Sequence, residues 1–146
     1  MSYYSDQDIT SANAKLVLTV DELYPNGVVL QQASAESFAT ADNVQVAETR
    51  MGVDGYMAAG VTPNIFPVTI NLEANSPSKR VMDHIKEAML SNKKPYRCSL
   101  TVDLESTGET YLYYRGVMQS GTSMPSIQRV LSPTQWMFHF ERMEKI

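Results

Sequence analysis

The sequence predicts a mainly β protein in which one amphipathic helix lies against an antiparallel sheet. Between positions 66 and 74, and again between 96 and 104, the even positions are apolar and most of the odd positions between them are polar. A period of two places one face of each strand on a core and the other in water. A single stretch after Ser76 has helical spacing instead. The chain therefore has two-faced strands and one helix.

The elements expected before position 66 are strands joined by polar connections. The Asn-Gly pair within 24–27 predicts a tight turn, because glycine and asparagine accept positive backbone angles. In chain order we expect a mobile arm at 1–13, strands at 15–21 and 28–32 around that turn, a connection at 34–43, and a strand at 44–50.

The helix is expected to begin at Asn75-Ser76-Pro77, which supplies a capping side chain and a proline in the first turn. Its apolar positions Val81, Ile85 and Met89 then recur at helical spacing. The elements that follow are strands at 96–104 and 109–118 around a turn at 105–108, a connection at 116–133 rich in glycine, serine and proline, and a last strand at 136–143.

Composition indicates a single domain spanning residues 1–146, long enough to bury a hydrophobic core. The formal net charge is -4, and basic and acidic residues are interspersed, so no basic stripe is present to bind a phosphate backbone. No run of 18 apolar residues exists to cross a membrane, and the first residues lack the pattern of a secretion signal. We expect a chain made and kept in a cytoplasm.

No residue cluster predicts catalysis, a metal or a cofactor, so we expect no enzyme. Cys98 is the single cysteine and lies on the apolar face of a predicted strand, which favours a packing role. His84 and His139 are far apart in the chain, and a zinc site needs three or four ligands. Neither a nucleophile elbow nor a phosphate-binding loop is present.

The segment Met51–Pro63 is too apolar for an ordinary surface connection, since Asp54 is its one charge. Left in water, its apolar side chains are costly. Two interpretations stay open: a loop folded back over its own core, or a contact between subunits. The candidate contact residues are Gly52, Val53, Asp54, Gly55, Tyr56, Met57 and Val61.

Two motifs resemble the tail tube proteins of contractile-tailed bacteriophages, the myovirus tail tube family, which is related to type VI secretion tube proteins. In that family a Gly-x-Asp-Gly turn precedes a Val-Thr-Ile-x-Leu strand, and Ser-Pro-Ser then leads into a helix. Here the run ETRMGVDG occupies 48–55 and VTINLEANSPS occupies 68–78, whereas Lys79 stands where the family has asparagine. The likeness covers about 44–92 by motif and the rest by element order.

The resemblance implies an antiparallel β-sandwich or barrel with one flanking helix and with strand edges completed by neighbouring subunits. It also implies hexameric rings that stack into the channel for DNA ejection. The implied partners are further copies of the chain, the tail sheath, baseplate and tail terminator proteins, and the tape measure protein and genomic DNA, which pass through the lumen without specific binding. The implied location is the virion tail, assembled in the cytoplasm of the host bacterium, with no membrane partner.

In such a tube, the polar faces of the two-faced strands are candidates to line the lumen. These candidates are Thr69, Asn71, Glu73, Ser99, Thr101 and Asp103. A wall of hydroxyls, amides and carboxylates offers DNA few positive charges to bind, so DNA can slide.

Two other functions stay open. One is a tail-tube initiator or baseplate protein, which forms a single ring without extended polymerisation. The other is a small β-barrel that binds a small ligand, which predicts a pocket lined by aromatic residues. Those residues are Tyr111, Tyr113, Tyr114 and Trp136.

Overall fold

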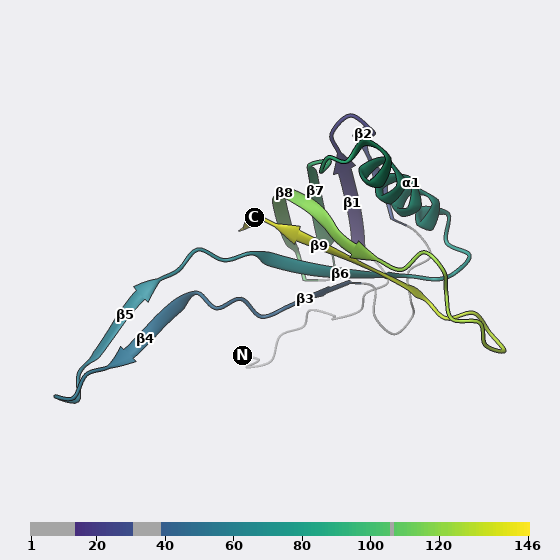
Figure 1. Ribbon diagram of the computed structural model, residues 1–146. Coiled ribbons are helices and arrows are strands. Elements are labelled where there is room, and N and C mark those ends of the chain that lie inside the picture. The colour runs from purple at the N-terminus through teal and green to yellow at the C-terminus, as the bar shows by residue number, and fades with distance from the viewer. Residues whose placement is uncertain (1–13, 31–38, 106) are drawn as a thin grey trace, which may run out of the picture.

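Figure 1 shows the computed structural model of the chain, which describes residues 14–30, 39–105 and 107–146. This described part of the chain is mainly β with one helix, as the sequence predicts. The elements are β1 (Ala14–Val20), β2 (Tyr24–Val29), β3 (Ala39–Ala41), β4 (Ala47–Met51), β5 (Met57–Val61), β6 (Phe66–Leu72), α1 (Pro77–Asn92), β7 (Cys98–Leu104), β8 (Glu109–Gly121), β9 (Thr134–Phe140) and β10 (Arg142–Lys145).

Eight strands form one antiparallel sheet in the order β2-β1-β7-β8-β9-β6-β3, and β10 also pairs with β8. The long strand β8 joins two halves of this sheet: its first part pairs with β7 and β10, and its last part pairs with β9. The helix α1 lies beside one half of the sheet, and β4 and β5 extend away from the body as a separate two-stranded unit (Figure 1).

The hydrophobic core is formed by the faces that the period of two selects. In β6 the side chains of Val68, Ile70 and Leu72 are buried, and in β7 those of Cys98 and Leu100 are buried. The same cluster receives three aromatic residues from β9 and the apolar face of the helix. Its largest fully buried side chains include Trp136, Phe138, Phe140, Met82 and Ile85.

The helix begins and ends through local capping interactions. The Ser76 side chain accepts a hydrogen bond from the Ser78 backbone N–H at 3.2 Å, and Pro77 occupies the first turn. At the other end Lys93 adopts the left-handed conformation, with φ 51°. Lys86 donates a hydrogen bond of 3.0 Å to the Gly121 carbonyl, so the helix is tied to the end of β8. Within the described residues, no helix is long and apolar enough to span a membrane.

The turn predicted at 24–27 is wrong. The reversal lies at 21–23, where Glu22 has φ 73°, and residues 24–29 form β2. Gly27 does have a positive φ of 86°, but it lies within β2, beside a shift of register against β1. The pairing of Val17 with Val29 fixes this arrangement. The strand predicted at 28–32 therefore begins earlier, and its last residues, 31 and 32, lie outside the described part of the chain.

Other boundaries differ where pairing partners decide them. The expected connection at 34–43 contains the short strand β3, and the segment 51–63 contains β5. The expected last strand is two strands, β9 and β10, which separate at Glu141 because they pair with different parts of β8. β8 itself continues to Gly121 instead of ending at 118. The arm expected at 1–13 lies outside the described residues.

Candidate assembly site

The segment Met51–Pro63 is part of a β-hairpin and not a loop: it contains the end of β4, the turn and all of β5. β4 and β5 pair from Ala47 opposite Val61 to Met51 opposite Met57. At the tip, the Gly52 N–H donates to the Tyr56 carbonyl at 2.8 Å, and Gly55 adopts a positive φ of 87°. Asp54 Oδ1 accepts from the Tyr56 N–H at 3.2 Å. The turn residues of the motif thus close the hairpin.

The hairpin has one apolar face and one mixed face. Residues directly opposite one another in an antiparallel ladder project from the same face. The pairs Met51–Met57 and Ala47–Val61, with Thr49–Ala59 between them, therefore share a face that carries no charge. The pairs Arg50–Ala58 and Glu48–Gly60 share the other face, which carries both charges of β4.

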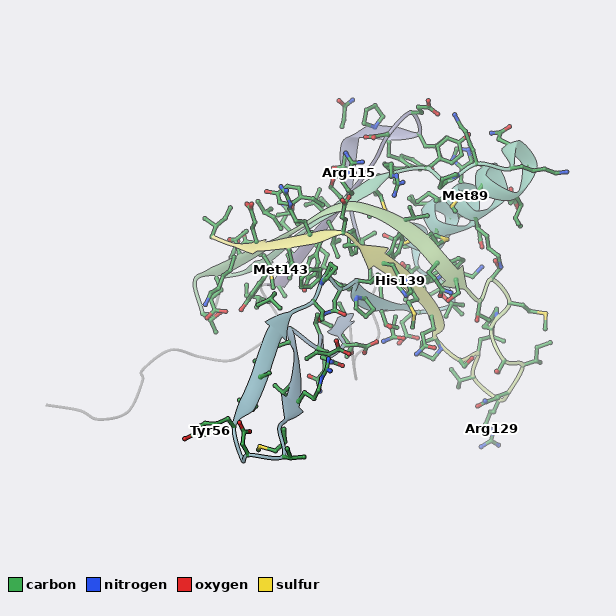
Figure 2. The ribbon with its side chains drawn as sticks, turned by 60° about the vertical axis from the view of Figure 1, so that its left-hand side comes forward. Tyr56, Met89, Arg115, Arg129, His139 and Met143 are labelled. Atoms are coloured by element: carbon green, nitrogen blue, oxygen red, sulfur yellow. The ribbon has the colours of Figure 1, made fainter. Side chains whose placement is uncertain are left out.

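All seven predicted contact residues lie together in this hairpin, and all are exposed. Relative exposure is 113% for Val53, 78% for Tyr56, 63% for Met57 and 89% for Val61. Figure 2 shows Tyr56 at the tip, far from the body of the protein. The segment is exposed, so the interpretation as a loop folded back over its own core is wrong. Contact with a partner stays a prediction.

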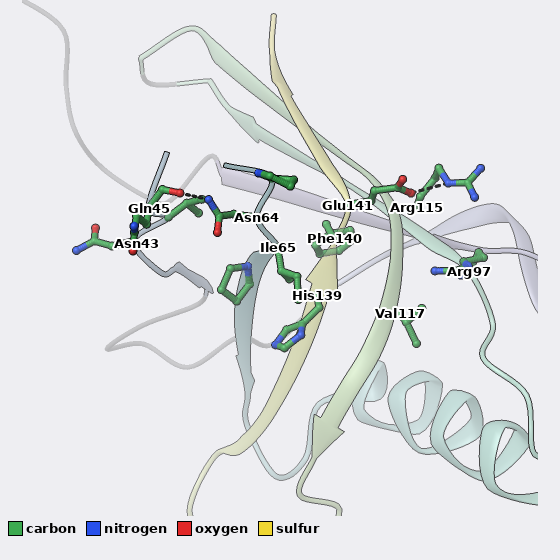
Figure 3. Close-up of a pocket in the computed structure, with 13 residues that line it drawn as sticks. Asn43, Gln45, Asn64, Ile65, Arg97, Arg115, Val117, His139, Phe140 and Glu141 are labelled. Atoms are coloured by element: carbon green, nitrogen blue, oxygen red, sulfur yellow. Dashed lines mark hydrogen bonds and ion pairs between the residues drawn. The ribbon is translucent and has the colours of Figure 1, made fainter. Parts of the chain in front are cut away.

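A groove of about 890 Å³ lies where the hairpin joins the body. Figure 3 shows Gln45 and Asn64 on the hairpin side of this groove, and His139 and Val117 on β9 and β8. The Asn64 side-chain amide donates to the Gln45 carbonyl, which holds the two arms of the hairpin together at their base. On the far side Arg115 donates to Glu141 at 2.7 Å.

The lumen candidates lie on the side of the sheet that faces away from the core, but in two separate groups. Ser99, Thr101 and Asp103 are half-buried on β7, between β1 and β8. Thr69 and Asn71 lie on β6, with Glu73 just beyond it, and Thr69 is only 8% exposed between β3 and β9. Apolar residues interrupt the expected polar wall, since Val17 and Leu112 flank Thr101.

Charges on this side of the sheet are balanced around β7 and β8. Lys15 of β1 is directly opposite Asp103 of β7. Arg142 and Glu144 of β10 flank the same side of β8, and the Tyr114 hydroxyl lies 3.4 Å from a Glu144 carboxylate oxygen. Each of these two sets of neighbours therefore contains one positive and one negative charge.

Two of the four aromatic residues expected in a ligand pocket lie in the hydrophobic core of the described part of the chain. Trp136 is fully buried and Tyr113 is 8% exposed, both within the core. None of the four predicted aromatic residues lines the groove at the base of the hairpin. The burial of Trp136 and Tyr113 supports the interpretation of these residues as core packing.

The histidines and the cysteine have structural surroundings. His84 Nδ1 is hydrogen-bonded to the Tyr24 hydroxyl at 2.9 Å, and His139 lies in the groove. Burial raises the pKa of the Cys98 thiol to about 12. Among the residues that the structure describes, no group of three or more metal-ligating side chains comes together.

Sequence reasoning missed a second exposed apolar element, the loop of residues 122–133 between β8 and β9. Its large exposed side chains are those of Met124, Ile127, Val130 and Leu131, from 47% to 80% exposed. The signal was present in the sequence, because this loop contains only one charged residue, Arg129. Its serine and proline residues are typical of an ordinary connection, which is what the sequence predicts there.

Comparison with solved structures identifies the fold. The tube-terminating cap of the anti-feeding prophage is similar over 100% of this chain and 94% of that chain, with a TM-score of 0.58 and 13% identity. A chain of the anti-feeding prophage baseplate is also similar: the match covers 100% of this chain and 97% of the baseplate chain, with a TM-score of 0.58 and 11% identity. A third match is a chain of the PVC sheath-tube complex, from an extracellular contractile injection system. The match covers 90% of this chain and 88% of the PVC chain, with a TM-score of 0.53 and 11% identity.

The fold is thus shared with components of contractile injection systems, which confirms at the level of the fold the resemblance to tail tube proteins. No curated protein matches the sequence at a significant level. A family model does match it, over residues 7–144, and that family is described as tail fiber protein gp32.

Proposed function

The chain belongs to the tail fiber protein gp32 family, and we propose that it is a non-enzymatic structural subunit that builds a tail tube by self-association. In this proposal one tail-tube-like domain, spanning 1–146, assembles into hexameric rings that stack into a tube. The observation that carries the proposal is the exposed hairpin β4–β5, whose uncharged face is unsuited to water.

Burial of this hairpin face supplies the energy for assembly. Apolar surface contributes roughly 25 cal/mol per Å² when it leaves water, so a few hundred Å² contribute several kcal/mol per copy. The hairpin is closed by its own ladder and turn, so little conformational entropy is lost when it docks. A rigid projection with an apolar face fits a repeated contact between copies.

The balanced surface of β1, β7, β8 and β10 fits a channel wall. Lys15 lies opposite Asp103 there and Arg142 lies near Glu144, so these four charges do not form a run of positive charge that would bind a polyanion. We propose that Thr69, Asn71, Glu73, Ser99, Thr101 and Asp103 face this lumen, through which the tape measure protein and DNA pass without specific binding. The sheath, the baseplate and a terminator are the proposed outer and end partners, in a virion tail assembled in the host cytoplasm.

Two substitutions in the same strand test the contact face. Met57→Asp puts a charge on the uncharged face, whereas Ala58→Asp puts it on the face that already carries Glu48 and Arg50. We expect Met57→Asp, and likewise Val53→Asp at the tip, to leave the subunit folded and to raise the concentration needed for assembly at least tenfold. Sedimentation velocity and negative-stain microscopy measure this, and Ala58→Asp serves as the control. A wild-type protein that stays monomeric at high concentration would contradict the proposal.

A single terminal ring is the second candidate function. The observation that favours it is the TM-score, which is 0.58 for both the cap chain and the baseplate chain and 0.53 for the sheath-tube complex chain. The same micrographs separate the two functions: isolated rings that never elongate indicate an initiator or baseplate ring, whereas long tubes indicate the tube subunit.

A further inference from the structure

The loop 122–133 is held as a defined projection by hydrogen bonds at its base. The Ser126 N–H donates to the Ser132 hydroxyl at 2.8 Å, and the Ser132 N–H donates to the Ser126 carbonyl at 3.3 Å. These two bonds close a turn that presents residues 127–131. Below it, Lys86 of α1 holds the Gly121 carbonyl, so the loop is tied to the helix.

The turn 127–131 carries apolar side chains at 127, 130 and 131 and polar ones at 128 and 129. Ile127 is 80% exposed and Val130 is 78% exposed, and Arg129 between them is the only charged residue of the loop. Fixed apolar side chains in water are costly, and the hydrogen bonds at the base prevent the turn from folding them away. This surface is suited to be covered by a partner with an apolar face and a negative charge.

The hairpin β4–β5 has these two properties, and it lies at the opposite end of the same molecule. Asp54 at its tip is the only charged residue of the segment 51–63. Figure 2 shows Tyr56 at the hairpin tip and Arg129 on the loop at opposite extremities of the chain. Figure 1 shows the sheet between the two projections. One molecule therefore cannot bring its own loop to its own hairpin.

We propose that the loop 122–133 of one copy packs against the uncharged face of the β4–β5 hairpin of a second copy, with Arg129 facing Asp54. This inference rests on the proposed self-association and names the surface that the hairpin contacts. One such contact covers both exposed apolar surfaces and pairs their single opposite charges. Since the two surfaces differ, the contact is head-to-tail: repeated from copy to copy, it closes into a ring where the rotation between copies permits and otherwise continues as a filament.

Cross-linking between two variants tests the contact directly. One chain carries Met57→Cys and the other, extended by a tag, carries Ile127→Cys. We expect a short bismaleimide to link the two chains to each other, because both residues lie in the proposed contact. Ala58→Cys, on the opposite face of β5, is the matched control and should link to Ile127→Cys at least tenfold less. The native Cys98 is buried and stays unlabelled.

Neutral variants test the charge pair by a double-mutant cycle. Asp54→Asn keeps a side-chain oxygen that accepts from the Tyr56 N–H, so the turn is preserved. We expect Asp54→Asn and Arg129→Gln each to raise the half-assembly concentration about threefold to tenfold, and the double variant to be no worse than either. Effects that simply multiply overturn the proposed pair.

The outcomes separate this inference from the proposed function. A wild-type chain that does not assemble overturns both. An assembling chain in which Met57→Cys links only to itself, or in which Ile127→Cys links to no hairpin position, overturns the head-to-tail contact alone. Linking that is specific to the Met57 face supports it.

Discussion

At two positions of β8 an aromatic ring occupies the space where any other residue would carry a Cβ atom. A Cβ added at Gly116 would lie 2.2 Å from a carbon of the Phe140 ring, and one added at Gly121 would lie 2.1 Å from the Trp136 ring. Both rings are buried in the core. These glycines therefore permit the close packing of β9 against β8. Glycine is required at both positions because a larger side chain would clash with a ring, and not because the backbone has a positive φ.

We expect Gly116→Ala to lower the free energy of unfolding by about 1–3 kcal/mol, because the methyl group displaces a ring that has no room to move. Gly60→Ala is the control, since a Cβ there meets nothing within 4 Å and the change should stay within about 0.5 kcal/mol. Urea unfolding of dissociated subunits measures both. Equal stability of the two variants would contradict the packing argument.

At the scale of the element, the hairpin β4–β5 is held by its own bonds and contributes nothing to the core. Its strands pair only with each other within the described chain. At its base the Thr62 N–H donates to the Val46 carbonyl at 3.3 Å. A structure that is kept rigid without stabilising the body is consistent with an assembly role.

Replacement of residues 47–61 by Asn-Gly should join Val46 to Thr62 through a tight turn and leave the body folded. We expect the free energy of unfolding of the subunit to change by less than about 1 kcal/mol, because no core side chain is removed. Assembly should be abolished. Circular dichroism and sedimentation velocity measure the two effects, and a variant that cannot fold would show that the hairpin has a structural role.

At the scale of the whole molecule, one core connects both halves of the sheet and the helix. Residues of β1, β6, β7, β9 and α1 belong to a single cluster. Cys98 lies within that cluster at 4% exposure. A reagent therefore reaches its sulfur only when the halves of the sheet and the helix separate.

The Cys98 thiol should for this reason report on global unfolding. Burial raises the pKa of the thiol to about 12, so in the folded subunit at pH 8 almost none of the thiol is the reactive thiolate. Unfolding exposes the thiol and returns its pKa to the ordinary value, so a larger fraction is thiolate and alkylation is faster. We expect alkylation by iodoacetamide at pH 8 to be slow in water and to accelerate with urea along the unfolding curve. Rapid labelling of the folded subunit would mean that the core opens locally.

The sequence by itself determined the elements that a core enforces. The alternation in β6 and β7 and the helical spacing of Val81, Ile85 and Met89 predicted the faces that pack on the core, because water and core impose a period on the chain. Of these helical residues Ile85 is fully buried, and Val81 and Met89 are partly buried. The apolar character of 51–63 also identified a candidate contact surface before its shape was known. These signals are local and depend on side-chain chemistry.

Only the tertiary structure decided what depends on pairing partners and on distance. β5 has no core to impose alternation, so its strand is set by its ladder with β4. The Asn-Gly pair favours a turn, but the register of β1 with β2 prevails over it. The separation of the hairpin and the loop 122–133 at opposite ends of the sheet arises from the long-range order of strands (Figure 1). Local propensity amounts to fractions of a kcal/mol per residue, whereas non-local pairing and burial act on many residues together.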